Sequence, residues 1–200
     1  MSAKYLLVFV AVLAVVHAVP TAPMKKCVPE QSEYIIAGRI AQVAMGVPGT
    51  YILVGTYSAD YKNRKEATVE TVLERSGKFV ANYTSIRVNE MSYLVDPANK
   101  KCTAEKVPPM DRFCTDSPGL KYETSWRSGR QMTDTYRYEQ PEANRTTTIT
   151  LFREGMILAS AVVDQIYKGI PQQITMAYGN FTMGIKDDTV FKLPSYCKDD

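Results

Sequence analysis

The chain has 200 residues, 45% of them hydrophobic, and its 24 basic and 21 acidic side chains give a formal net charge of +3. The two signs are interspersed and the densest basic run is KNRK at 62–65, so we expect no nucleic-acid partner. The only histidine is His17, which removes Ser-His-Asp and Cys-His catalysis from the rest of the chain. With no glycine-rich phosphate loop or nucleophile elbow, an enzyme is disfavoured.

Residues 1–18 have the pattern of a secretory signal peptide. Lys4 precedes an apolar run at 5–16, and small residues at Val16 and Ala18 form a cleavage site. An uncleaved membrane anchor is the alternative, but this run is short for a bilayer and no later stretch approaches a spanning length. We therefore expect a secreted protein, or a luminal or lysosomal one, without a transmembrane segment.

An extended, proline-containing arm is expected at 19–33, followed by a single domain at 34–200. Turn residues separate short segments that have the pattern of strands, which predicts an antiparallel all-β protein with few or short helices. The expected strands are 34–40, 50–57, 67–74, 78–88, 91–96, 120–127, 132–139, 146–152, 156–164, 172–183 and 188–193. A helix is the alternative for 156–168, which mixes helix formers with β-branched residues.

Three Asn-x-Thr sequons are glycosylation candidates, at Asn82, Asn144 and Asn180. Alternation in 78–84 places Asn82 on the solvent side. In 172–183 the apolar positions change from even to odd at Gly179, which predicts a β-bulge there. The slip would turn Asn180 outward.

The four cysteines are Cys27, Cys102, Cys114 and Cys197. An even number in an oxidising compartment predicts two disulfides, and the sequence alone leaves three pairings open. No C-x-x-C occurs, so a zinc site or a redox dithiol is a poor interpretation. Calcium needs only oxygen ligands; Asp187 and Asp188 are candidates, with solvated turn acids as the alternative.

Tyrosine is abundant, with 13 residues in the chain, and methionine shares several strand faces with it. Such side chains can line an adaptable apolar cavity or fill an ordinary core, and composition does not decide between the two. From strand phase, the candidates for a pocket lining are Phe79, Tyr83, Tyr93, Tyr136, Tyr138 and Tyr178.

Three stretches carry a resemblance to a known family. They are Tyr57-Ser58-Ala59-Asp60 with Arg64, Tyr93-Leu94-Val95-Asp96 running on to Cys102, and the C-terminal GIKDDTVFKLPSYC at 184–197. On these motifs the chain resembles the ependymins and ependymin-related proteins over most of its mature length. The C-terminal stretch is the most distinctive, and we expect it to form a turn at 184–188 and a short edge strand with Val190 and Phe191.

The resemblance implies two stacked, curved antiparallel sheets around an apolar pocket, similar to bacterial lipoprotein carriers. It also implies a secreted, glycosylated homodimer that binds lipids, and for some members an association with calcium and extracellular matrix. In the family pattern Cys102 pairs with Cys197. Cys27 matches the family's early cysteine, whose usual partner is absent near 169–171, so Cys27 is assigned to Cys114.

Two hypotheses follow. The first is a non-enzymatic secreted glycoprotein that binds a lipid or other hydrophobic ligand in a β-sheet pocket, with no required cofactor. The alternative is a calcium-associated structural or adhesion protein of extracellular or mineralised matrix. A hydrolase comes third, because the mature chain lacks histidine.

Overall fold

A computed structural model describes residues 26–197, so the expected signal peptide and residues 19–25 of the expected arm lie outside the described residues. In this part the chain forms eleven strands and two short 3-10 helices. The strands are β1 (Gln31–Ala44), β2 (Val47–Asp60), β3 (Lys65–Glu74), β4 (Phe79–Val88), β5 (Met91–Asp96), β6 (Lys101–Lys106), β7 (Leu120–Ser128), β8 (Gln131–Gln140), β9 (Arg145–Phe152), β10 (Ile157–Tyr167) and β11 (Ile170–Met183). The helices are η1 (Pro141–Ala143) and η2 (Asp188–Phe191).

All eleven strands belong to one antiparallel sheet in the order β6-β5-β4-β3-β2-β1-β11-β10-β9-β8-β7. Each strand pairs with its neighbour in sequence, except where β1 pairs with β11 and so joins the two ends of the described chain. The prediction of an antiparallel all-β fold is confirmed. The two expected sheets are two halves of one continuous sheet, because β1 and β11 are hydrogen-bonded along most of their length.

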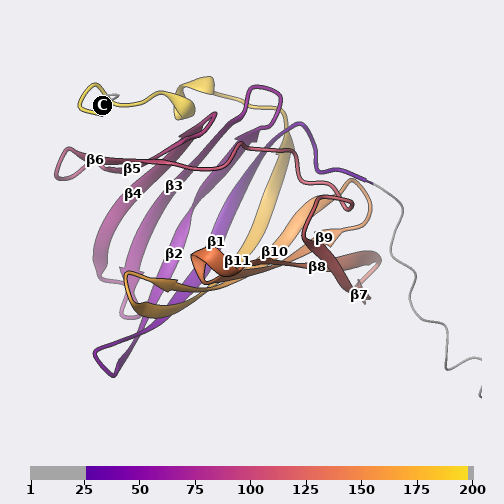
Figure 1. Cartoon of the computed structure of the whole chain (residues 1–200), viewed down its shortest axis with the longest axis horizontal. Coiled ribbons are helices and arrows are strands. Elements are labelled where there is room, and N and C mark those ends of the chain that lie inside the picture. Colours follow the sequence, from indigo (N-terminus) through magenta and orange to yellow (C-terminus); the bar gives the residue numbers. More distant parts are fainter. Residues whose placement is uncertain (1–25, 198–200) are drawn as a thin grey trace, which may run out of the picture.

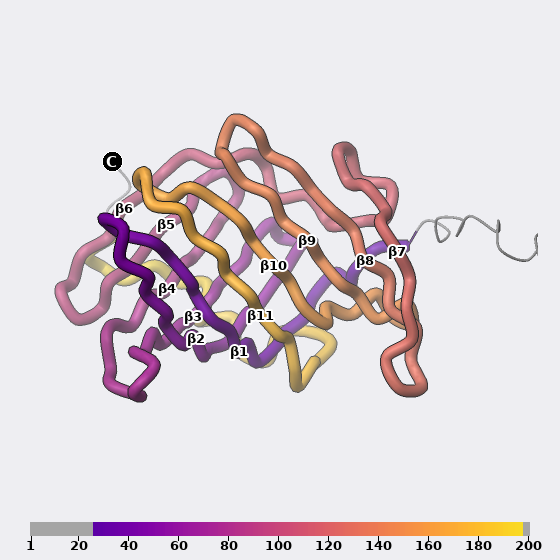
Figure 2. The backbone as a smooth tube through the Cα atoms, turned by 90° about the horizontal axis from the view of Figure 1, so that it is seen from below, coloured from indigo at the N-terminus to yellow at the C-terminus, as the bar shows by residue number. Residues whose placement is uncertain are grey.

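The sheet is strongly bent along β1 and β11. In Figure 1 the strands β2 to β6 stand as one wall and β8 to β11 form a second wall at an angle to it. The view from below in Figure 2 shows β1, β11 and β10 passing in front of β3, β4 and β5. We call the side of the sheet that carries Tyr34 and Leu53 the inner face, and the opposite side the outer face. No helix among residues 26–197 is long and apolar enough to cross a bilayer.

The break in β11 confirms the predicted bulge and places it one residue further on. Gly179 pairs with Ile35, but the next paired residue, Thr182, faces Glu33, so the ladder shifts between them. Asn180 absorbs the shift with a φ of 47°, in the left-handed region that asparagine tolerates better than most residues. Asn180 is exposed, as expected, and Phe181 returns to the inner face.

Three expectations about elements were wrong. Strand β6 was not expected, because KCTAEK is short, charged and mostly exposed at the edge of the sheet. The segment 188–193 is not a strand: the Asp187 side chain accepts from the Thr189 N–H at 2.9 Å and starts helix η2. Strand β1 begins at Gln31, inside the expected arm, whereas β10 confirms the strand expected at 156–164 over its helical alternative.

The C-terminal segment covers part of the outer face of the first wall, over β3, β4 and β5. Phe191 is buried against Ala67 and Ile86, on β3 and β4. Further along, Cys197 packs with Tyr93 and Val95 of β5. A disulfide joins Cys197 to Cys102 on β6, as the resemblance implies, and fixes the segment to the edge of the sheet.

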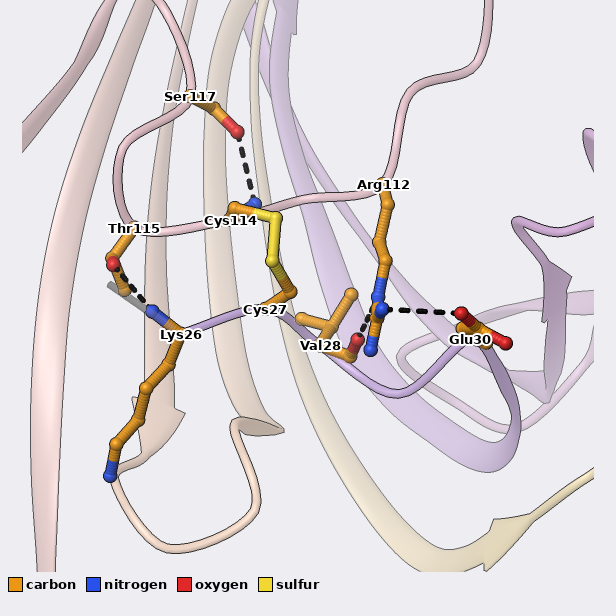
Figure 3. Close-up of a disulfide and its surroundings, with 8 residues drawn as sticks. All are labelled: Lys26, Cys27, Val28, Glu30, Arg112, Cys114, Thr115 and Ser117. Carbon is orange, nitrogen blue, oxygen red and sulfur yellow. Dashed lines mark hydrogen bonds and ion pairs between the residues drawn. A yellow bond between two sulfur atoms is a disulfide. The ribbon is translucent and has the colours of Figure 1, made fainter. Parts of the chain in front are cut away.

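The second disulfide, Cys27–Cys114, ties the residues before β1 to the long connection between β6 and β7 (Figure 3). The two segments also exchange hydrogen bonds. Arg112 Nε donates to the Val28 carbonyl at 2.6 Å, and the Lys26 N–H donates to Thr115 Oγ1 at 3.0 Å. Both irregular segments are therefore held by covalent and polar contacts.

Candidate functional site

Four aromatic rings gather on the inner face where β1, β2 and β11 lie side by side. Tyr34 is the centre of the cluster: its ring centroid lies 6.1 Å from Tyr57, 5.6 Å from Tyr178 and 5.3 Å from Phe181. Tyr57 and Tyr178 are 6.2 Å apart and meet edge to face. These separations are within the range of favourable aromatic pairs. We call these four residues the aromatic cluster.

Aliphatic side chains extend the inner face away from the aromatic cluster. Ile36 and Leu53 are buried beside it, and Ile40 packs against them. On β11, Met176 pairs with Gly38 and Ile174 pairs with Ile40, so both point to the inner face. Ile40, Ile174 and Met176 are only half-buried, which leaves part of each side chain accessible. The inner face therefore offers apolar surface that the protein itself does not fully cover.

Two carboxylates of β3 also lie on the inner face. Glu70 pairs with Gly55 and Glu66 lies further along the same face, where its Oε2 accepts from the Tyr57 hydroxyl at 3.3 Å. Burial raises the pKa of both carboxyls, and for Glu66 the charge of Arg87 partly offsets it. Burial likewise raises the pKa of Tyr57 well above its usual value. The inner face is thus a weakly hydrated environment that contains polar groups.

The structure brings four of the expected pocket residues to the inner face. Tyr83 pairs with Glu70, and Tyr178 belongs to the aromatic cluster. Tyr136 and Tyr138 lie on the second wall, where they pair with Ile149 and Thr147. Tyr136 is fully buried between other rings, so it is part of the core.

The two other expected pocket residues were placed wrongly. Tyr93 lies on the outer face, where it is buried beneath the C-terminal segment with Cys197. Phe79 begins β4 beyond a register shift and is 54% exposed. Strand alternation shows which residues share a face, but the outer face of this wall is also covered, so alternation does not show which face is the inner one.

Sequence reasoning missed Tyr34, Tyr57 and Phe181 of the aromatic cluster. The sequence does carry a signal for Tyr34, because Tyr34 and Ile36 are two positions apart on one strand and so share an apolar face. The two glutamates of β3 carried a misleading signal. Glu66 and Glu70 alternate with apolar residues in KEATVETVLE, which favours a solvent-facing position for both.

The remaining candidate residues lie on the surface. Asn82, Asn144 and Asn180 are all exposed. Asp187 is the cap of η2 and Asp188 is exposed in its first turn. Within residues 26–197, no three His, Cys, Asp or Glu side chains gather in a way that could hold a metal ion.

Two open pockets lie away from the aromatic cluster. The larger has a volume of about 600 Å³ and lies at the end of the sheet where the β1–β2 and β10–β11 hairpins turn, next to the start of β9. The smaller, of about 520 Å³, lies beside the Cys27–Cys114 disulfide and includes Arg112 and Glu30 in its wall. The Arg112 guanidinium already contacts Val28 and Glu30.

No family model and no curated protein matches this chain. Among solved structures, it is similar to an uncharacterised conserved protein of Thermus thermophilus, with 8% identity and a TM-score of 0.49 over 84% of this chain and 87% of that one. A putative outer membrane lipoprotein-sorting protein domain from Vibrio parahaemolyticus matches with 8% identity and a TM-score of 0.36 over 80% and 88% of the two chains. A DUF1329 family protein from Desulfovibrio piger matches with 7% identity and a TM-score of 0.37 over 82% of this chain and 90% of that one. Identities and TM-scores this low say nothing about ligand or activity.

Proposed function

We propose that the protein is a secreted, non-enzymatic glycoprotein of the ependymin type that binds a lipid or another hydrophobic ligand on the inner face of its bent sheet. The observation that carries the proposal is the set of half-buried apolar side chains there. Ile40, Ile174 and Met176 lie next to the aromatic cluster, and each keeps accessible surface. Exposed apolar surface in contact with water is unfavourable, so an apolar ligand that covers it gains the free energy of its burial.

The composition of the inner face suits an apolar chain rather than one rigid molecule. Tyrosine presents broad, rigid rings, while methionine is flexible and adapts to irregular shapes. Tyr57, Tyr178 and Met176 come from strands that lie on either side of β1, so they could contact one ligand together. The carboxylates of Glu66 and Glu70 would border its polar end.

Native mass spectrometry of the full chain, purified from a secretory eukaryotic host without detergent, tests this proposal. We expect a bound lipid or fatty acid that leaves the protein only when it is denatured. Protein that carries no such adduct, and that takes up none from lipid vesicles after purification, would overturn the proposal.

We also propose that the protein forms a homodimer through the outer face. Ile35, Val54 and Val69 lie on three adjacent strands, β1, β2 and β3, and are 49%, 40% and 43% exposed. Val54 follows Leu53 of the inner face, so Val54 and its pairing partners Ala37 and Thr71 lie on the outer face. An apolar strip across neighbouring strands is the kind of surface that a second copy covers.

A further inference from the structure

The larger pocket opens on the outer face and combines apolar and polar walls. Thr146 pairs with Asp164 and Asp164 pairs with Gln173, so these three polar side chains share the outer face. Ile166 and Pro171 lie beside them. The pocket is open to solvent, and its volume is about 600 Å³.

One wall of this pocket contains a complete glycosylation sequon. Asn144, the acceptor, and Thr146, the sequon hydroxyl, both line it. Asn144 is exposed and has a φ of 47°. Its N–H donates to the Pro141 carbonyl at 3.0 Å and its own carbonyl accepts from the Ile166 N–H at 3.2 Å. These bonds fix the backbone of Asn144 at the rim, so a group attached to its side chain starts at the pocket.

The other two sequons differ in this respect. Asn82 lies on β4, where its side-chain oxygen accepts from Thr71 Oγ1 at 2.8 Å, and Asn180 lies at the bulge of β11. Neither residue lines the larger or the smaller pocket. The chain therefore contains two matched controls for any property that depends on the pocket.

The walls of the pocket match the chemistry of N-acetylglucosamine, the first sugar of an N-glycan. The acetyl methyl group and the C–H face of the ring are apolar and fit against Ile166, which is 51% exposed, and Pro171. Hydroxyl and acetamido groups need hydrogen-bond partners. Asp164 Oδ1 accepts from Gln173 at 2.8 Å, and the carboxylate has further acceptor sites for a sugar N–H or O–H.

We propose that this pocket holds the innermost N-acetylglucosamine residues of a glycan on Asn144. In forming this glycan, Asn144 Nδ2 bonds to the anomeric carbon of an oligosaccharide carried on a lipid pyrophosphate, the sugar–phosphate bond breaks, and the amide nitrogen loses one proton. No oxidation or reduction takes place. The inference rests on the proposed glycosylation and not on the hydrophobic ligand.

Release of the glycans by peptide N-glycosidase, followed site by site by mass spectrometry on the full chain from a secretory eukaryotic host, tests the inference. In the folded protein we expect release from Asn144 to be about ten-fold slower than from Asn82 and Asn180, and the three rates to become equal after denaturation. Ile166→Asp, which changes an exposed wall residue, should speed release at Asn144 alone, whereas Thr175→Asp, on the same face but outside the pocket, should not.

Equal release rates in the folded protein would overturn the inference, as would glycans on Asn82 or Asn180 with none on Asn144. Release at Asn144 that is slow but insensitive to Ile166→Asp would also contradict it. A protein with no glycan at any of the three sites would refute the proposed glycosylation itself, together with this inference.

Discussion

The hydroxyl of Tyr57 on β2 donates to Glu66 Oε2 on β3 at 3.3 Å, on the inner face of the sheet. This contact places a carboxylate beside the aromatic cluster, where hydration is weak. Glu70, on the same face of β3, has no ion pair among residues 26–197, and burial alone raises the pKa of its carboxyl. The two glutamates are the main polar groups at the proposed ligand site.

Glu70→Gln should stabilise the protein near neutral pH. A carboxyl whose pKa is raised by folding binds more protons in the folded than in the unfolded state, so its contribution to stability falls as the pH rises from the ordinary glutamate range through the raised pKa. We expect the variant to gain roughly 1 kcal/mol in free energy of unfolding at pH 7 and much less at pH 4. Urea denaturation at both pH values measures this, with the exposed Glu105→Gln as control; an equal gain at both values would contradict the account.

Asp134 and Arg153 form an ion pair between β8 and the end of β9, in which the carboxylate is buried and the Arg153 side chain is 39% exposed. The Asp134 side chain is completely buried and accepts from Arg153 Nη2 at 2.6 Å and from Ser125 Oγ at 2.5 Å. Burial raises the pKa of Asp134, but these hydrogen bonds outweigh it and hold the pKa below its usual value. This stabilisation is present above the ordinary aspartate range and is lost as the pH falls through the lowered pKa.

Asp134→Ala should therefore lower the free energy of unfolding at pH 7 by about 2 kcal/mol, because Arg153 and Ser125 lose their shared charged acceptor. The exposed pair Lys121–Glu139, at 3.3 Å, is the control, and Lys121→Ala should change stability by less than about 1 kcal/mol. Thermal denaturation of both variants measures the loss of stability in each. Similar losses in the two would show that burial does not strengthen the Asp134 pair.

Removal of the Cys102–Cys197 disulfide should release the C-terminal segment from the outer face. The bond closes a loop with a sequence separation of 95, and loss of such a cross-link destabilises by about 4 kcal/mol. In the double variant Cys102→Ser, Cys197→Ser we expect faster amide exchange at Val95 and Phe191. Unchanged exchange at both residues would mean that packing alone holds the segment in place.

Val54→Arg should convert the proposed dimer to a monomer, because it puts a charge in the centre of the exposed apolar strip on the outer face. Light scattering coupled to size-exclusion chromatography measures the mass, and Thr175→Arg, on the same face of β11, is the matched control. A monomeric wild type, or a Val54→Arg variant that remains dimeric, would refute this interface.

Much of the fold could be predicted from the sequence because alternation and turn residues are local signals. The strand at 91–96 was predicted with its observed bounds, and the phase slip at Gly179 predicted the bulge that Asn180 forms. The polar edge strand β6 carried no such signal. Helix η2 was missed because its start depends on a hydrogen bond from Thr189 to Asp187, and apolar residues around it suggested a strand.

The candidate site was harder to predict because it depends on which face of each strand points inward. Tyr93 and Tyr178 look equivalent in sequence, yet one lies under the C-terminal segment and the other in the aromatic cluster. The difference arises from the disulfide of Cys197, which brings a segment far away in sequence over the outer face. Glu66 and Glu70 lie on the inner face because the residues that alternate with them on β3 point to the outer face. There the first wall also buries apolar side chains, such as Ala67.

The most direct test of the proposed ligand site is a titration of delipidated protein with a fluorescent fatty acid, compared between two neighbouring positions of β11. Met176 lies on the inner face and Thr175 on the outer face. We expect Met176→Lys to weaken binding by about ten-fold or more, because a charge would have to be buried against the ligand, while Thr175→Lys binds as the wild type does. Equal affinities of the two variants, or no saturable binding to the wild type, would contradict the account.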